Sequence, residues 1–298
     1  MKHPGLAALV FMIAVNFQFS APHAAAATEP ADGVSVGRPS VVRKLVPAER
    51  LERQAALQYG QMKQQAAAKK ALAPDDHPQL VRLRAIAREL IPHSTKFNER
   101  ARSWNWEISL IESKQINAFC MPGGKIAFYT GILDQLKLTD DEAAMVMGHE
   151  IAHALREHAR ERIAKTELTR TGSALVSELL GFGDTGRIAM NVGGNLLTMR
   201  FSRQDESESD LIGMEIAARA GYDPRAGITL WQKMSAASKG APPQWLSTHP
   251  SGPSRIREIE KHLPEVMPIW VRARALRPAT AAPGSQVVPE RMPTDRRP

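Results

Sequence analysis

The chain has 298 residues, of which 39 are Lys or Arg and 31 are Asp or Glu, so its formal net charge is +8. Its single cysteine excludes an intrachain disulfide. The basic residues are dispersed and only 5% of the residues are aromatic. Nucleic acid is therefore not an expected partner, whereas attraction to an anionic membrane surface or to an acidic client protein stays open.

Residues 1–27 have the pattern of a secretory signal peptide. Lys2 provides a basic start, Leu6 to Phe19 an apolar stretch too short for a comfortable membrane span, and Ala24 to Ala27 small-residue cleavage sites. Removing this segment deletes one lysine and no acidic residue, so the mature net charge is 8 − 1 = +7. Cys120 lies far from the cleavage site, which argues against a lipoprotein anchor. We expect a soluble periplasmic protein without a transmembrane helix in the mature chain.

Residues 28–74 form a basic N-terminal extension that is expected to be partly helical. Residues 28–47 are rich in Pro, Gly and small polar residues, which predicts disorder. Residues 48–72 are rich in Ala, Gln, Lys and Arg and indicate a helix of uncertain packing. A folded domain is expected over residues 75–265.

The domain begins with a helix capped by Asp75 or Asp76, and residues 104–113 and 125–130 have the composition of strands. After the second strand the pattern is again helical. Further helices are expected around 168–200, from Glu206 to Ala220, after Asp223-Pro224 and near 253–262. Residues 266–298 form a tail rich in Pro and Arg that is predicted to be largely disordered.

Residues 149–153 read His-Glu-Ile-Ala-His, inside an apolar helix that opens with a capping box at 139–142. Residues four apart on a helix project from the same face about 6 Å from each other, so His149 and His153 can share one tetrahedral Zn²⁺. Glu150 lies beside such a metal, where a carboxylate can take a proton from water. A buried helix carrying these three polar side chains needs a reason, and one bound zinc ion supplies it.

A catalytic zinc needs a third protein ligand. The metzincin arrangement is excluded, because Arg156 and Ala159 stand where that class needs Gly and His. His158 is five residues beyond His153, away from its helical face, and is predicted to be a solvated residue.

The third ligand is expected in the acidic segment 202–210. Glu206 and Asp210 are four residues apart and share a helix face. Glu206 is the predicted ligand, with Glu208 as its first substitute. Asp210 is predicted to accept the outer N–H of a ligand histidine, which fixes the tautomer of that ring.

Together these blocks resemble the zinc metallopeptidases that include HtpX, the CAAX prenyl endopeptidases, mitochondrial Oma and the periplasmic protease BepA. The resemblance covers residues 78–263 and rests on four segments in the order of the family. They are Asn117 to Ile126, His-Glu-Ile-Ala-His at 149–153, Ser-Arg-Gln-Asp-Glu-Ser-Glu-Ser-Asp at 202–210, and Ser-Thr-His-Pro at 247–250 with Arg255-Ile256. Ser209 replaces the usual alanine, a small change. We expect a single-domain protease, without the long helical-repeat domain of BepA and without the membrane segments of HtpX and the prenyl endopeptidases.

The resemblance implies an α+β, mostly helical zincin-like fold with a small sheet packed on the motif helix, and one Zn²⁺ per chain. An edge strand within 115–130 would pair with an extended peptide, with Asn117, Ala118 and Phe119 as substrate-binding residues. An ordinary protected edge strand is the alternative. The resemblance also places His249 at the active site, as an oxyanion donor or as a fourth ligand that keeps the enzyme latent. From the residues alone it is a loop histidine.

The predicted function is a periplasmic zinc metalloendopeptidase that cleaves unfolded or misassembled envelope proteins, outer-membrane proteins among them. A second hypothesis is a chaperone-like envelope assembly factor whose zinc protease site is normally latent and which contacts the membrane or the assembly machinery. A third is a structural metal site with four closed ligands.

Overall fold

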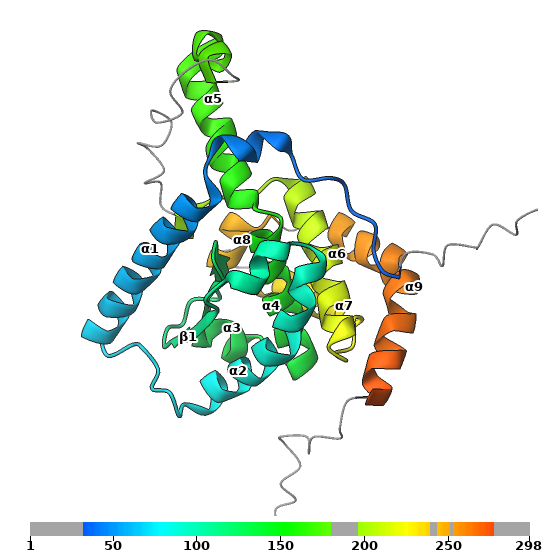
Figure 1. Cartoon of the computed structure of the whole chain (residues 1–298). Coiled ribbons are helices and arrows are strands. Elements are labelled where there is room, and N and C mark those ends of the chain that lie inside the picture. The colour runs from blue at the N-terminus through cyan, green and yellow to red at the C-terminus, as the bar shows by residue number, and fades with distance from the viewer. Residues whose placement is uncertain (1–31, 180–195, 239–242, 251–252, 277–298) are drawn as a thin grey trace, which may run out of the picture. The chain divides into compact units, whose positions relative to one another are not determined.

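A computed structural model describes residues 32–179, 196–238, 243–250 and 253–276 (Figure 1). The signal-peptide prediction for 1–27 and the tail from 277 lie outside the described residues. The helices are α1 (Ala48–Ala68), α2 (Pro78–Leu90), α3 (Thr130–Gln135), α4 (Asp140–Leu155), α5 (His158–Leu179), α6 (Arg203–Arg219), α7 (Ala226–Ala237), α8 (Gln244–Thr248) and α9 (Pro253–Leu276). Among the described residues, no helix is both long and apolar enough to cross a membrane.

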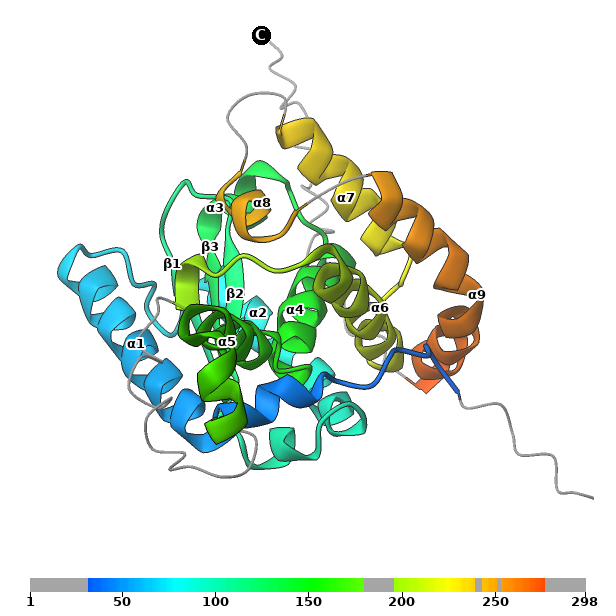
Figure 2. The same ribbon diagram turned by 90° about the horizontal axis from the view of Figure 1, so that it is seen from above.

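The strands form one small sheet that packs against α4, the helix with the His-Glu-Ile-Ala-His motif. They are β1 (Glu107–Ile111), β2 (Ala118–Met121) and β3 (Lys125–Tyr129), in the order β1-β3-β2. β3 pairs in parallel with β1 and antiparallel with β2, which is an edge strand. Figure 2 shows α4 between this sheet and α6. The predicted α+β, mostly helical fold with a small sheet against the motif helix is confirmed.

Helix α4 begins and ends where local chemistry requires it. The Thr139 hydroxyl accepts from the Glu142 N–H, and the Glu142 carboxylate accepts from the Thr139 N–H, which completes the predicted capping box. The helix ends at Leu155, and Glu157 then adopts a left-handed backbone with φ of 57°. Because of this break, α5 leaves in a new direction from His158.

Two glycines let α4 and α6 approach at backbone distance. A Cβ built on Gly148 would lie 2.7 Å from the Gly213 carbonyl oxygen, and one built on Gly213 would lie 2.5 Å from the His149 nitrogen. Only residues without a side chain fit such a crossing. The close approach carries the acidic face of α6 to the histidines of α4.

Two predictions about order were wrong. Residues 32–47 are not disordered, because Val34 is buried and donates its N–H to Glu215, and Val41–Leu45 form a 3₁₀ helix against α5. The helix expected near 253–262 continues to Leu276, past the predicted start of the tail at 266. It contains Pro264 and Pro268, and its apolar side packs against α6 and α7. The apolar residues concerned are Val266, Ile269 and Trp270.

Candidate metal centre

Four buried side chains bring their ligand atoms within 4.8 Å of one another: His149, His153, Glu206 and His249. His149 Nε2 lies 3.1 Å from His153 Nε2, and Glu206 Oε1 lies 3.4 Å from His153 Nε2 and 3.1 Å from His249 Nδ1. Ligands bound at about 2.0–2.1 Å around a tetrahedral metal ion are roughly 3.4 Å apart. The spacing and the mix of imidazole and carboxylate donors therefore fit one metal ion.

The electrostatics of the cluster also suit a cation. Burial lowers the pKa of His153 well below its ordinary value, so this ring is neutral and keeps a lone pair for a metal. Burial alone would raise the pKa of Glu206, but the neighbouring His249 and His153 lower it far below its ordinary value. A neutral imidazole and an ionised carboxylate are the forms in which these residues bind metals.

Arg255 fixes the acidic side of the site. Its guanidinium donates to both oxygens of Asp210, at 2.6 Å and 2.5 Å, and also to Glu206. Asp210 Oδ1 lies 3.0 Å from His149 Nδ1, so this carboxylate can accept the outer N–H of the ring. Burial would raise the pKa of Asp210, but Arg255 and His149 lower it. In the sequence, Arg255 is part of the Arg255-Ile256 segment, and its residue type alone predicted no role in the site.

Glu150 lies beside the cluster and is held by α8. Trp245 Nε1 donates to Glu150 Oε1 at 2.6 Å, and His249 Nε2 lies 3.6 Å from the same oxygen. The Trp245 ring is fully buried and stacks on the ring of His249. The role of Trp245 could not be predicted from the sequence, because no spacing rule connects residues 95 positions apart in the chain. Its position two residues before the Ser-Thr-His-Pro segment at 247–250 is the sequence signal that could have placed it near the site.

The prediction that His158 is solvated was wrong. Its side chain is buried, and its Nδ1 lies 3.0 Å from His153 Nδ1. The prediction assumed a continuous helix, whereas the left-handed residue Glu157 breaks the helix and returns His158 to the face of His153. Glu208, the substitute ligand, is not one of the four clustered side chains and accepts from Arg156 at 2.9 Å.

A model of the family described as Peptidase family M48 matches residues 79–263, which is more than half of the chain. The chain belongs to peptidase family M48.

Several curated relatives carry names from this family. The mitochondrial metalloendopeptidase OMA1 of Schizosaccharomyces pombe is 35% identical over 197 residues, which cover 65% of this chain and 56% of the relative. OMA1 of Arabidopsis thaliana is 37% identical over 153 residues, covering 51% and 30%. The beta-barrel assembly-enhancing protease of Escherichia coli is 30% identical over 177 residues, covering 55% and 36%. The chain thus spans between about a third and just over half of these relatives.

The edge strand of the M48 domain borders the cluster. Asn117, Ala118 and Phe119 line a cavity of about 30 Å³ together with Glu150, His153 and His249. Leu196, Leu197, Met199 and Phe201 line the same cavity. The Phe201 ring centre lies 4.1 Å from that of His153. The space has room for about two water molecules.

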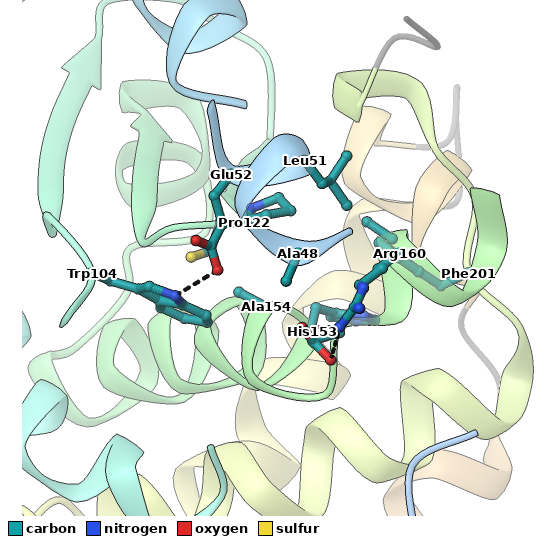
Figure 3. Close-up of a pocket in the computed structure, with 12 residues that line it drawn as sticks. Ala48, Leu51, Glu52, Trp104, Pro122, His153, Ala154, Arg160 and Phe201 are labelled. Atoms are coloured by element: carbon teal, nitrogen blue, oxygen red, sulfur yellow. Dashed lines mark hydrogen bonds and ion pairs between the residues drawn. The ribbon is translucent and has the colours of Figure 1, made fainter. Parts of the chain in front are cut away.

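A second cavity, of about 20 Å³, adjoins His153 on the side of α1 (Figure 3). Ala48 and Leu51 line it with apolar surface, and Glu52 accepts from Trp104 Nε1 at 3.0 Å at its edge. Helix α1 lies outside the segment that matches the M48 model. A part of the chain that precedes the family domain therefore covers one side of the candidate metal centre.

Proposed function

We propose that this chain is a zinc-dependent endopeptidase that hydrolyses internal peptide bonds. The observation that carries the proposal is the buried set of His149, His153 and Glu206 with the Glu150 carboxylate beside it. Two imidazoles and one carboxylate are a common ligand set of catalytic zinc. We assign one Zn²⁺ per chain to these three ligands, and Asp210 to the orientation of His149.

A zinc ion at this place would polarise the scissile carbonyl and lower the pKa of water towards neutrality. Glu150 accepts a proton from the attacking water and delivers it to the leaving amine. The hydrogen bond from Trp245 Nε1 holds this carboxylate in place, so its proton-accepting oxygen is preorganised. Glu150 therefore serves first as the general base and then as the general acid, so a second acidic residue is not required for these two proton transfers.

The substrate class follows from the strand beside the cluster. β2 pairs with β3 along one side only, and its residues line the cavity at Glu150. An extended peptide can add to such an edge through main-chain hydrogen bonds, with Asn117, Ala118 and Phe119 contacting it. This favours unfolded or misassembled polypeptides. The signal-like residues 1–27 and the name of the Escherichia coli relative support envelope proteins in the periplasm as the setting, with outer-membrane proteins as candidate clients.

A chelation experiment with the full-length protein tests the metal dependence. We expect a strong chelator to abolish cleavage of unfolded casein and stoichiometric Zn²⁺ to restore it. Thiol reagents and Cys120→Ser should leave the rate unchanged, because burial raises the pKa of the Cys120 thiol well above its ordinary value and keeps it protonated. Resistance to chelators combined with inhibition by thiol reagents would refute a zinc mechanism.

A second candidate function is a chaperone-like assembly factor whose protease site is normally latent. The position of His249 favours it, because its Nδ1 lies 3.1 Å from Glu206 Oε1 and 3.3 Å from His149 Nε2, at ligand spacing. A fourth protein ligand occupies the position that a catalytic zinc keeps for water. In this second function His249 takes that position and does not act as an oxyanion donor.

His249→Ala is therefore expected to raise the rate of casein cleavage, because it frees the fourth position. The matched control is His262→Ala on α9, whose ring nitrogens pair with the neighbouring acids Glu258 and Glu265. A rate lowered by about 10²–10³-fold would instead assign His249 to the oxyanion. An unchanged rate would remove His249 from both roles.

A further inference from the structure

The break between α4 and α5 places a further histidine, His158, next to the proposed metal site. Because Glu157 is left-handed, His158 lies over His153 instead of one and a half turns further along a helix. The His158 side chain is 2% exposed, so its two ring nitrogens depend on protein partners. The identity of these partners determines where its proton lies.

One nitrogen of His158 faces acids and the other faces a ligand histidine. His158 Nε2 lies 3.4 Å from Glu208 Oε2 and 3.9 Å from Asp205 Oδ1. His158 Nδ1 lies 3.0 Å from His153 Nδ1 and 3.5 Å from the Ser209 hydroxyl, which can donate to a lone pair on this nitrogen. Carboxylates are acceptors only, so the proton of a neutral His158 is placed on Nε2. Its Nδ1 then has a lone pair directed at His153.

The proton of His153 is placed in the same way. With an acceptor at 3.0 Å, its proton is placed on Nδ1. The lone pair of His153 Nε2 is then directed at the cluster, where this atom lies 3.1 Å from His149 Nε2 and 3.4 Å from Glu206. A metal ligand imidazole needs this tautomer.

We infer that His158 is a positioning residue that fixes the tautomer and the ring orientation of His153. The inference rests on the metal site of the proposed function. The two ligand histidines of α4 thus have different partners, a carboxylate for His149 and an imidazole backed by Glu208 for His153. The sequence form of this arrangement is a histidine five residues after His-Glu-x-x-His.

Arg156 connects Glu208, the partner of His158, to the N-terminal extension. Arg156 donates its Nε–H to Glu208 Oε2 at 2.9 Å and a second N–H to the carbonyl of Gly37. Gly37 precedes the segment that matches the M48 model. Glu208 is therefore held between Arg156 and His158, and the orientation of His153 is connected through these contacts to the extension.

The test is zinc affinity of the full-length protein, measured by competition with a chelating dye. We expect His158→Leu to bind Zn²⁺ about 10–100-fold more weakly than wild type, as loss of a ligand's partner typically does. His158→Asn should recover most of the affinity, because its amide oxygen can accept from His153 Nδ1–H. His262→Leu is the matched control and should bind as wild type. Circular dichroism of each chelated variant reports the fold independently of zinc.

Two outcomes would overturn this inference and leave the proposed metal site standing. The first is wild-type zinc affinity in His158→Leu. The second is an equal loss of affinity in His158→Leu and His158→Asn, which would indicate a packing role. Glu208→Ala provides an independent measurement if His158→Leu fails to fold. It should weaken Zn²⁺ binding less than His158→Leu does in a folded protein, and unchanged affinity contradicts the connection through Glu208. A wild-type protein that binds no Zn²⁺ would overturn the metal site itself, and this role with it.

Discussion

Glu150→Gln is expected to lower peptide hydrolysis by about 10²–10⁴-fold, the usual contribution of a general base, while zinc content and fold are retained. The amide has nearly the shape of the carboxylate, and its oxygen can still accept from Trp245 Nε1, so the buried indole keeps its partner. What is lost is the basic oxygen that takes the proton of water. Casein cleavage and metal content of the same purified sample provide the measurement.

Glu260→Gln, an exposed change on α9, is the matched control and should leave the rate unchanged. A Glu150→Gln protein that cleaves casein at the wild-type rate would show that Glu150 is not the base. A protein that loses zinc together with activity would place Glu150 among the ligands instead.

Glu206→Ala is expected to lose more zinc affinity than the 10–100-fold that removal of a ligand's partner causes, because it removes the carboxylate ligand itself and leaves only imidazoles around the ion. It should also destabilise the fold, since Arg255 is buried and loses one of its two acidic partners. Breaking a buried ion pair costs about 3–5 kcal/mol. Zinc titration and urea unfolding of the chelated protein measure the two effects separately.

The matched control is Glu260→Ala, which removes an exposed acid and should change neither quantity. Glu206→Gln is a second variant, because its amide keeps the shape and a hydrogen bond from Arg255 while it removes the charged ligand. If Glu206→Ala binds zinc normally and Glu208→Ala does not, the third ligand is Glu208 and α6 is rotated from the position described here.

Local chemistry could be predicted from the sequence because neighbouring residues determine it. The spacing of His149 and His153 on one helical face, the capping box at Thr139 and the shared face of Glu206 and Asp210 each involve residues within four positions. Such patterns predict an element and the class of metal it can bind. They also indicated the mostly helical domain with a small sheet and the peptidase family.

The long-range contacts could not be predicted in this way. Gly148 and Gly213 determine how closely α4 and α6 approach. An isolated glycine in a helical pattern, however, does not indicate which other helix packs against it. Arg255 reaches Asp210 and Glu206 across 45 and 49 positions of sequence, and Trp245 reaches Glu150 across 95. These partners are chosen by packing, which a period of 3.6 residues does not encode.

The sequence by itself determined which residues can bind a metal and which one can serve as a base, because residue type and helical period are local properties. Only the tertiary structure decided which side chains meet at the site. It brought His249 close enough to Glu206 for both to bind the same metal ion. It also turned His158 back onto His153 through the left-handed residue Glu157. The physical reason is that backbone breaks and helix crossings set the position of every later residue, and both depend on contacts made by the whole domain.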